Sequence, residues 1–472
     1  MYKRMKRTFW LLIVACLSSQ LHAQNASDNL AKAWSLFEAD SQLQSAVASI
    51  YIVDESSGAI VFDKNSRIGL APASTQKIIT AAAAYELLGK DFCFQTKFGY
   101  YGGIKRGRLA GSIVVLPSGD PTLGSWRWKS TSEDSVMRRI VKALAQTRIQ
   151  SFNGFTVIES GKDEEAIPGG WIWEDIGNYY GAGATALNWR ENQYDLILKS
   201  GKNVGDSVEI VGTKPSLYNC SITSKLKAAA KGSGDNSIIY FPVTTSALVL
   251  RGTIPAGEEK FVVSGAMPSP KRQFLATLTD SLARRGTAKE GEDETVSQTN
   301  YDASKLTVFH TEVSPPLDSM SYWFLKRSIN LYGEAFAKRI AITNNRPFTS
   351  EDGASVIANL WSSKGIGIDR NELHTYDGSG LSPLNRVTTH AQVSILQYAK
   401  KQAWFSSYFN CFPEFNGMKL KSGTINRVKS FCGYHTSKAG KSYIVSFIVN
   451  NYNGASSALV QKMYKVLDVL KN

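Results

Sequence analysis

The sequence predicts an α/β (α+β) protein with a large β-rich insert, and three observations support this prediction. A strand–turn–strand pattern followed by a helix stands near the start of the chain, and a similar pattern stands at its end. Between them, residues 91–300 change to short β-type runs broken by glycine, asparagine and serine. A chain of 472 residues, 43% hydrophobic and 20% charged, is globular in composition and long enough for two or three domains.

The first hairpin and its helix precede the insert. Residues 47–53 and 59–62 are strand candidates separated by a serine- and glycine-containing turn. Residues 73–88 follow as a helix rich in alanine and isoleucine, which Gly89 closes. Ser74 therefore falls in the first turn of a predicted helix.

Within the insert, turn residues bound the β-type runs as they bound short strands. These runs are 111–116, 194–198, 237–241 and 247–250. A helix over 274–285 and an acidic polar loop or linker over 286–300 are expected to end the region.

After the insert, the sequence is mainly helical as far as residue 400, with helices expected over 319–342 and 389–400. Strands return at 429–435 and 443–450, joined by the turn 437–440. A last amphipathic helix presents apolar residues at helical spacing, which we interpret as core. They are Leu459, Val460, Met463, Val466, Leu467 and Leu470.

Residues 1–23 have the pattern of a signal peptide. Four cations precede the apolar run 9–17, which is too short to span a bilayer, and Leu21-His22-Ala23 offers a cleavage site. We therefore expect an exported protein of the periplasm or cell envelope. Cys16 gives a second interpretation, because Ile13-Val14-Ala15-Cys16 resembles a lipoprotein cleavage box and cleavage there would leave a lipid anchor.

The charge and the cysteines limit the partners that the chain can have. The net charge of +14 includes the four signal-peptide cations, so the mature chain keeps a modest excess. That excess suits an anionic polymer or peripheral membrane association, and equally suits plain solubility. Because no basic run contains interleaved aromatic residues, we expect no nucleic acid partner.

Four cysteines remain after the signal peptide, and in an oxidising compartment they permit three pairings. They are Cys93, Cys220, Cys411 and Cys432. We favour four mostly buried thiols, because a domain of this size needs no disulfide. With no CxxC motif and no Cys/His cluster of zinc spacing, we expect neither a metal ion nor another cofactor.

Ser74-x-x-Lys77 places a hydroxyl and an amine one helical turn apart on the same face. The amine can take the serine proton if it is held neutral. Spacing alone is a weak signal, because Ser224-x-x-Lys227 matches it. Context separates the two, since Ser74 opens a helix after a hairpin whereas Ser224 lies in a polar part of the insert.

Two further motifs follow Ser74 in order. Ser328-Ile329-Asn330 lies in a helical region, and Lys421-Ser422-Gly423-Thr424 precedes a two-strand pattern. Ser151-Phe152-Asn153 and Lys199-Ser200-Gly201 match the same two patterns, but they lie inside the insert and in the wrong order.

The three ordered motifs resemble the Ser-x-x-Lys, Ser-x-Asn and Lys-Thr/Ser-Gly set of the penicillin-recognising enzymes. Over nearly the whole mature chain, the sequence resembles the low-molecular-mass class C penicillin-binding proteins. These are D-Ala-D-Ala carboxypeptidases/endopeptidases with a large insert between the first two motifs. Other short motifs that resemble the family are Ala71-Pro72-Ala73-Ser74, Gly119-Asp120-Pro121-Thr122-Leu123, Gly170-Trp171-Ile172-Trp173, Asp377-Gly378-Ser379-Gly380-Leu381-Ser382, Gly433-Tyr434 and Phe447-Ile448-Val449-Asn450.

The resemblance implies a β-lactamase/transpeptidase-like domain in which helices flank an antiparallel sheet. Residues 24–90 and 301–472 would form it, with 91–300 as the inserted β-rich domain or domains. It also implies hydrolysis of peptidoglycan stem peptides and cross-links, with β-lactam antibiotics as covalent inhibitors. The alternatives are a serine β-lactamase or esterase, and a catalytically silent wall-binding homologue.

The resemblance further implies a role for each motif residue. Ser74 would attack the carbonyl of the penultimate D-Ala, and Lys77 would be the base if desolvation and the cation Lys421 lower its pKa. Ser328 would pass a proton toward the leaving amine. Asn330 would hold a substrate amide and help to position Lys77.

The third motif would bind the other end of the scissile unit. Lys421, Ser422 and Thr424 would receive the terminal carboxylate beside Gly423, and the backbone N–H groups of Ser74 and Thr424 would form the oxyanion hole. Asp120 would meet a cationic stem-peptide side chain at the cleft rim, or would only form a turn.

Three residues depart from the family pattern. Ile329 replaces a common aspartate in the second motif, and Ser422 replaces the usual threonine of the third but keeps a hydroxyl. Pro383 stands where close relatives often have an arginine that recognises the diamino-acid side chain of the stem peptide. Preference for that side chain is therefore left open.

Overall fold

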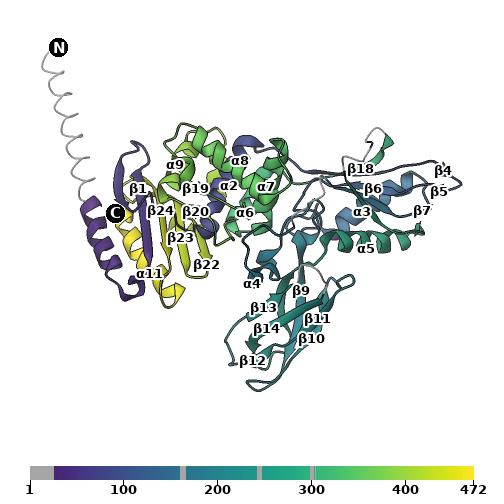
Figure 1. Cartoon of the computed structure of the whole chain (residues 1–472), viewed down its shortest axis with the longest axis horizontal. Coiled ribbons are helices and arrows are strands. Elements are labelled where there is room, and N and C mark those ends of the chain that lie inside the picture. The colour runs from purple at the N-terminus through teal and green to yellow at the C-terminus, as the bar shows by residue number, and fades with distance from the viewer. Residues whose placement is uncertain (1–25, 160–165, 242–246, 298–301, 303–304) are drawn as a thin grey trace, which may run out of the picture. The chain divides into compact units, whose positions relative to one another are not determined.

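A computed structural model describes residues 26–159, 166–241, 247–297, 302 and 305–472 (Figure 1). The described chain divides into two compact units. The first unit contains the residues up to Ala82 together with Ala358–Thr375 and Pro383–Asn472, and the second contains Ala83–Ile357 and Tyr376–Ser382. The residues predicted as signal peptide lie outside the described ranges. The predicted division into domains stays a prediction.

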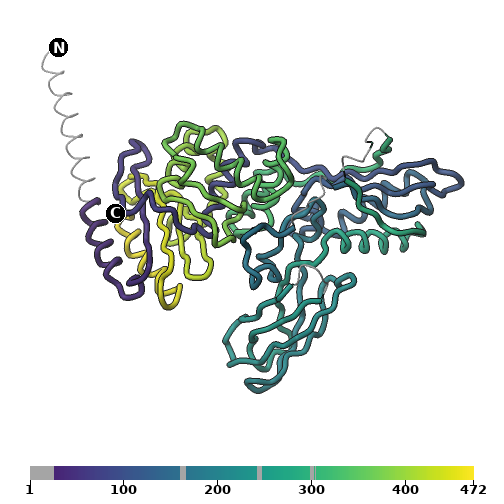
Figure 2. The backbone as a smooth tube through the Cα atoms, in the orientation of Figure 1, coloured from purple at the N-terminus to yellow at the C-terminus, as the bar shows by residue number. Residues whose placement is uncertain are grey.

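A six-stranded antiparallel sheet forms the centre of the first unit, in the order β2-β1-β24-β23-β22-β21. Its strands are β1 (Val47–Asp54), β2 (Ile60–Lys64), β21 (Glu414–Phe415), β22 (Met418–Ile425), β23 (Val428–Thr436) and β24 (Ser442–Asn450). Strand β1 pairs with β24 along its whole length, from Val47 with Asn450 to Asp54 with Tyr443. Segments from the two ends of the chain thus share one sheet (Figure 2), and the predicted antiparallel fold is confirmed.

Helices cover both faces of this sheet, so that successive residues of a strand enter different cores. On one face, Phe447 packs with Trp34 of the helix over 26–38 and with Met463 of α11. On the other, Ser446 of the same strand donates from Oγ to Gln392 of α9 at 2.6 Å. The remaining elements of this unit are η1 (Ser41–Leu43), η2 (Ala73–Gln76), η7 (Arg370–Glu372), β19 (Leu373–His374), β20 (Arg386–Val387), α9 (Thr389–Lys400), α10 (Phe405–Asn410), α11 (Ser456–Leu467) and η8 (Asp468–Lys471).

Two helices run from one unit into the other, namely α2 (Lys77–Leu87) and α8 (Ser350–Ser363). No helix in the described part of the chain is long and apolar enough to cross a membrane. The final helix packs into the core as predicted, with Leu459, Met463, Val466 and Leu467 buried and Val460 partly buried. Leu470 is also buried, but it lies in the following turn η8.

The second unit is β-rich, as predicted for the insert, and its described residues form four sheets. A five-stranded sheet has the order β17-β8-β6-β3-β18, and a four-stranded one the order β16-β7-β5-β4. A three-stranded sheet and a second four-stranded sheet are built from β9 to β15. The strands are β3 (Gln95–Tyr100), β4 (Ile104–Lys105), β5 (Arg108–Leu109), β6 (Ile113–Leu116), β7 (Ser151–Phe152), β8 (Phe155–Glu159), β9 (Gln193–Ser200), β10 (Val208–Lys214), β11 (Ser221–Ser224), β12 (Lys227–Ala229), β13 (Asn236–Tyr240), β14 (Ala247–Pro255), β15 (Phe261–Ala266), β16 (Ala288–Lys289), β17 (Glu294–Ser297) and β18 (Thr307–Val313).

Helices α3 and α5 share a buried core with the five-stranded sheet, where Val136, Ile140 and Leu278 lie among strand residues such as Phe98 of β3. The sequence-based prediction missed α3, although its apolar residues have helical spacing. The helices and short turns of this unit are α3 (Glu133–Gln146), α4 (Trp173–Ile176), η3 (Tyr179–Gly181), η4 (Arg190–Asn192), α5 (Pro270–Ala283), α6 (Leu317–Lys326) and α7 (Asn330–Thr343).

Two predictions about this region were wrong. The segment 286–300 is not simply a polar loop, because β16 and β17 within it pair in parallel with β7 and β8. Its last residues, from 298, lie outside the described ranges. The single helix expected over 319–342 is interrupted, since α6 ends at Lys326 and α7 begins at Asn330, and Ser328 between them has φ +57°. A left-handed residue cannot continue a right-handed helix.

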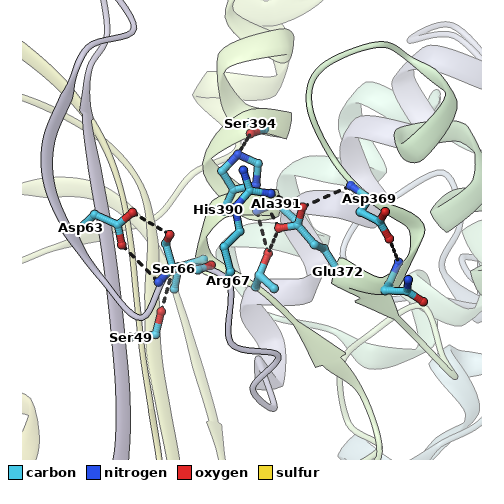
Figure 3. A network of polar contacts seen from close by, with 12 residues as sticks. Ser49, Asp63, Ser66, Arg67, Asp369, Glu372, His390, Ala391 and Ser394 are labelled. Carbon is cyan, nitrogen blue, oxygen red and sulfur yellow. Dashed lines mark hydrogen bonds and ion pairs between the residues drawn. The ribbon is translucent and has the colours of Figure 1, made fainter.

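Glu372 connects three segments of the first unit through hydrogen bonds (Figure 3). Its carboxylate accepts from Arg67 Nη1 at 2.7 Å and from Thr388 Oγ1 at 2.6 Å, and lies 2.9 Å from His390 Nδ1. Thr388 also caps α9 by accepting from Ala391 N. Although burial opposes ionisation, the hydrogen bonds from His390 and Thr388 lower the pKa of Glu372 to about 2.

We predict that Glu372→Gln lowers the free energy of unfolding at neutral pH by about 2–3 kcal/mol, because the partners lose an ionised acceptor. A depressed carboxyl pKa stabilises the fold above its unfolded value and loses that effect as pH falls through the folded value. The difference between the variant and the parent should therefore shrink between pH 4.5 and about 2. Urea unfolding as a function of pH measures this, with the exposed Glu414→Gln as control. A constant difference across that range would contradict it.

Candidate active site

Ser74 lies in the 3-10 turn η2, immediately before α2 begins at Lys77. The Nζ of Lys77 donates a hydrogen bond to Ser74 Oγ at 3.0 Å, and the Lys77 side chain is buried. A hydroxyl and an amine at this separation can exchange a proton directly. The spacing seen in sequence therefore corresponds to contact in space.

The turn that presents Ser74 is held in an unfavourable backbone conformation. Ala73 has φ +47°, a region that costs a residue with a Cβ roughly 1–2 kcal/mol. Buried hydrogen bonds hold the turn, because the carbonyl of Pro72 accepts from Thr75 Oγ1 at 2.7 Å and from Ser430 Oγ at 2.6 Å. Gln392 in turn donates to Thr75 Oγ1 at 3.0 Å.

Strand β22 passes directly beside this turn. A Cβ on Gly423 would lie 2.3 Å from Ser430 Oγ, 2.6 Å from Pro72 O and 2.9 Å from Ser74 N, which is too close for any side chain. Glycine is thus required at the third-motif position because two backbones approach each other. The approach also brings the backbone of Thr424, the next residue, close to the serine.

Lys421 is buried in the same unit, and its Nζ donates to the carbonyl of Ser422 at 2.7 Å. Burial, followed by the charges of Lys77 and Lys429, holds the pKa of Lys421 well below its ordinary value. No carboxylate of the described residues forms an ion pair with Lys421. Repulsion between buried ammonium groups therefore favours a state in which one lysine is neutral and can accept a proton.

Lys429, which the motif analysis missed, lies opposite Thr424 in the register of β22 and β23. Its Nζ donates to Thr424 Oγ1 at 2.8 Å, and burial lowers its pKa. Its only sequence signal is the distance of five residues from Thr424, which becomes informative once the hairpin register is known.

The second-motif residues lie in the second unit, at the break between α6 and α7. Ser328 is the left-handed residue of the break, and Asn330 is the first residue of α7. Asn330 Nδ2 donates to the carbonyl of Tyr180 at 2.7 Å.

A buried carboxylate holds this break from both sides. Glu191 accepts from Arg127 Nε at 2.7 Å and Nη2 at 2.9 Å, and from the hydroxyl of Tyr332 in α7 at 2.8 Å. The same arginine lies over the ring of Trp323 in α6, 5.0 Å from its centroid. Glu191 belongs to three successive left-handed residues, with φ between +52° and +54°, a conformation that the sequence alone did not reveal.

Asp120 is buried in the second unit and forms a turn. Its Oδ1 accepts from the N–H of Thr122 at 2.7 Å and from Thr122 Oγ1 at 2.6 Å, and burial raises its pKa to about 6. These contacts match the turn-forming interpretation.

Asp377 likewise forms a turn by accepting from the N–H groups of Gly380 and Ser382 and from Trp171 Nε1. Burial and the charge of Asp377 raise the pKa of Glu334 to about 7.

Among the described residues, no group of three or more histidine, cysteine or acidic side chains is arranged to hold a metal ion. Cys93, Cys220, Cys411 and Cys432 form no disulfide bond in the described part of the chain.

Comparison with known proteins identifies related sequences and folds. A model of the D-Ala-D-Ala carboxypeptidase 3 (S13) family matches residues 30–414. The D-alanyl-D-alanine carboxypeptidase of Actinomadura sp. strain R39 is 23% identical over 89% of this chain and 81% of its own length. The carboxypeptidase DacB of Haemophilus influenzae is 23% identical, covering 84% and 83%. The crystal structure of penicillin binding protein 4 (dacB) from H. influenzae has the same fold, with a TM-score of 0.77 at 21% identity over 91% of this chain and 97% of that one.

We predict that Gly423→Ala slows covalent labelling by fluorescent penicillin at least about tenfold, because the added Cβ must displace the Ser74 turn or the strand. Gly212→Ala is the matched control, since a Cβ there meets nothing within 4 Å. Quenching the labelling reaction at a series of times and measuring gel fluorescence gives the rate of covalent labelling. Equal labelling of the two variants would show that the close approach does not position the serine.

Proposed function

Because the chain belongs to the D-Ala-D-Ala carboxypeptidase 3 (S13) family, we propose that Ser74 is the nucleophile of this serine-type D-Ala-D-Ala carboxypeptidase. The observation that supports this assignment best is the hydrogen bond from Lys77 to Ser74 beside a second buried lysine, Lys421. Ser224 has no such lysine partner among the described residues, and its hydroxyl accepts from the N–H of Leu226.

In the first step, Ser74 Oγ attacks the carbonyl carbon of the penultimate D-Ala and its proton moves to a neutral lysine amine. The peptide bond then breaks, the carbonyl stays bound to Oγ as an ester, and the leaving amine takes a proton. We assign that proton delivery to Ser328, and substrate-amide binding to Asn330. Water hydrolyses the ester in the second step and regenerates the serine.

Negative charge on the carbonyl oxygen develops close to backbone donors. The N–H groups of Ser74 and Thr424 are the proposed oxyanion hole, and each such donor is typically worth a few kcal/mol. The short separations at Gly423 support this role, because they bring the two backbone segments together.

The carboxylate of the leaving group is expected to bind at Lys421, Ser422 and Thr424. Lysines 77, 421 and 429 provide positive charge there, and no carboxylate of the described residues pairs with Lys421 or Lys429. An anionic substrate group would offset their repulsion. Asp120 is less suited to substrate binding, because its carboxylate is buried in its own turn.

Peptidoglycan stem peptides ending in D-Ala-D-Ala are the proposed substrates, together with cross-links that share this bond. β-Lactams are the proposed covalent inhibitors, and the H. influenzae protein with the same fold was solved with a β-lactam. Such substrates lie outside the cytoplasmic membrane, which agrees with export directed by residues 1–23. Location in the periplasm or cell envelope, with or without a lipid at Cys16, is therefore part of the proposal.

We predict that Ser74→Ala abolishes penicillin labelling and release of D-Ala from a purified pentapeptide muropeptide, whereas Ser224→Ala changes neither. Mass spectrometry of the products measures loss of the terminal residue and cleavage of cross-links separately. Labelling that survives in Ser74→Ala would assign the nucleophile elsewhere. Fast release of hydrolysed penicillin, in place of a long-lived ester, would favour the β-lactamase alternative.

We predict that Lys429→Met moves the acid limb of the kcat/KM profile to higher pH. Loss of this charge removes one cause of the lowered pKa of Lys421. The coupled pair of Lys77 and Lys421 then loses its first proton, which leaves Lys77 neutral as the base, only at a higher pH. Lys429→Arg keeps the charge and should leave the limb in place. Initial rates of D-Ala release measured against pH test this, and an unmoved limb in Lys429→Met would exclude electrostatic coupling.

A further inference from the structure

A cavity of about 650 Å³ opens within the second unit. Its lining includes Gly119, which precedes Asp120, but no residue of the Ser74, Ser328 or Lys421 motifs. Strands β3 and β6, the second half of α7 and the loop before α8 provide its walls. Three aromatic rings, Phe92, Phe94 and Phe348, supply apolar surface. Its volume lies within the range of about 300–1,000 Å³ that is usual for small-molecule sites.

The charge of this cavity is positive and unbalanced. Arg339 and Lys97 line it, and none of the described residues in its wall is acidic. The alternation of β3 explains how Lys97 reaches it, because Gln95 and Lys97 are exposed whereas Thr96 and Phe98 are buried. Neither cation forms an ion pair with a described residue.

Arg339 has a buried hydrogen-bond donor that no described residue satisfies. Its Nε is buried without a hydrogen-bond acceptor among the described residues, and its guanidinium stacks over Phe92, 5.3 Å from the ring centroid. Burial lowers the pKa of Arg339, as expected for a cation without a counter-charge. A guanidinium stays charged, so leaving its buried Nε–H without an acceptor is unfavourable.

We propose that this cavity binds a ligand with a carboxylate on an apolar or aromatic body. The carboxylate pairs with the guanidinium of Arg339, with Lys97 at the rim, and the body lies against the phenylalanine rings. A planar guanidinium matches a carboxylate through two parallel hydrogen bonds, and Lys97 adds a second positive charge beside it.

The proposed site is separate from the reaction chemistry. Arg339 lies nine residues after Asn330 on α7, which corresponds to roughly 13 Å along the helix axis. Binding there does not require Ser74 to react. The inference therefore stands whether or not the nucleophile assignment is correct.

Isothermal titration of the full chain with N-acetyl-L-phenylalanine tests the proposal, beside its uncharged amide and inorganic phosphate. We expect the carboxylate to bind with at least about tenfold higher affinity than the amide, and Arg339→Gln to remove that preference. Arg138→Gln, an exposed arginine on α3, should leave it unchanged. Ser74→Ala should bind as the parent does, which separates this cavity from the motif site.

Several results would overturn the proposal. Equal affinity for the acid and the amide, no binding at millimolar concentrations, or an unchanged preference in Arg339→Gln would each do so. Tighter binding of phosphate would reject a carboxylate as the ligand. If Arg339→Gln fails to fold, Lys97→Met provides the second variant, because its exposed side chain can be lost without opening the core, and a several-fold weaker carboxylate affinity is expected.

Discussion

Burial of positive charge beside Ser74 is the constraint on which the first unit depends. Lys77 and Lys421 are both buried, and a charge in such surroundings is costly unless it is paired or neutralised. No carboxylate in the described part of the chain pairs with Lys421, and the charge of Lys429 lies close enough to lower the pKa of Lys421 further. Such an arrangement opposes simple stability and favours an amine that loses its proton. The same lysines leave positive charge for an anionic substrate group.

Backbone strain occurs at two places in the motif regions. Ala73, directly before Ser74, and Ser328, in the second motif, are both non-glycine residues with left-handed backbones. Each persists because polar contacts within its own unit hold it, through Thr75 and Ser430 in one case and Glu191 with Arg127 in the other. Conformations of this kind are retained when the surroundings fix them, as commonly happens in active sites.

Sequence patterns predicted the parts of the structure that local residues determine. Hairpins, the final helix and the motif spacings follow from apolar periodicity and turn residues, and these gave the antiparallel sheet correctly. The break at Ser328 was missed because no glycine or proline marks it, and apolar periodicity continues across it. Strands β16 and β17 were missed because their polar sequence becomes strand only by pairing with distant β7 and β8. The role of Lys429 could be inferred only from the register of the hairpin that places it opposite Thr424. The role of Arg339 could be inferred only once its Nε was seen to lack an acceptor among the described residues.

The two sets of contacts leave the motif residues little room to move. Rates of bond-forming steps can fall about a hundredfold when a reacting group moves by an ångström. Ser74 is positioned by a backbone approach at Gly423 that leaves no room for a methyl group, and by hydrogen bonds that are buried. Asn330 is positioned at a helix start whose neighbour Tyr332 bonds to a fully buried carboxylate. In both places the precision comes from side chains outside the motifs, so the motifs alone are insufficient to define the site.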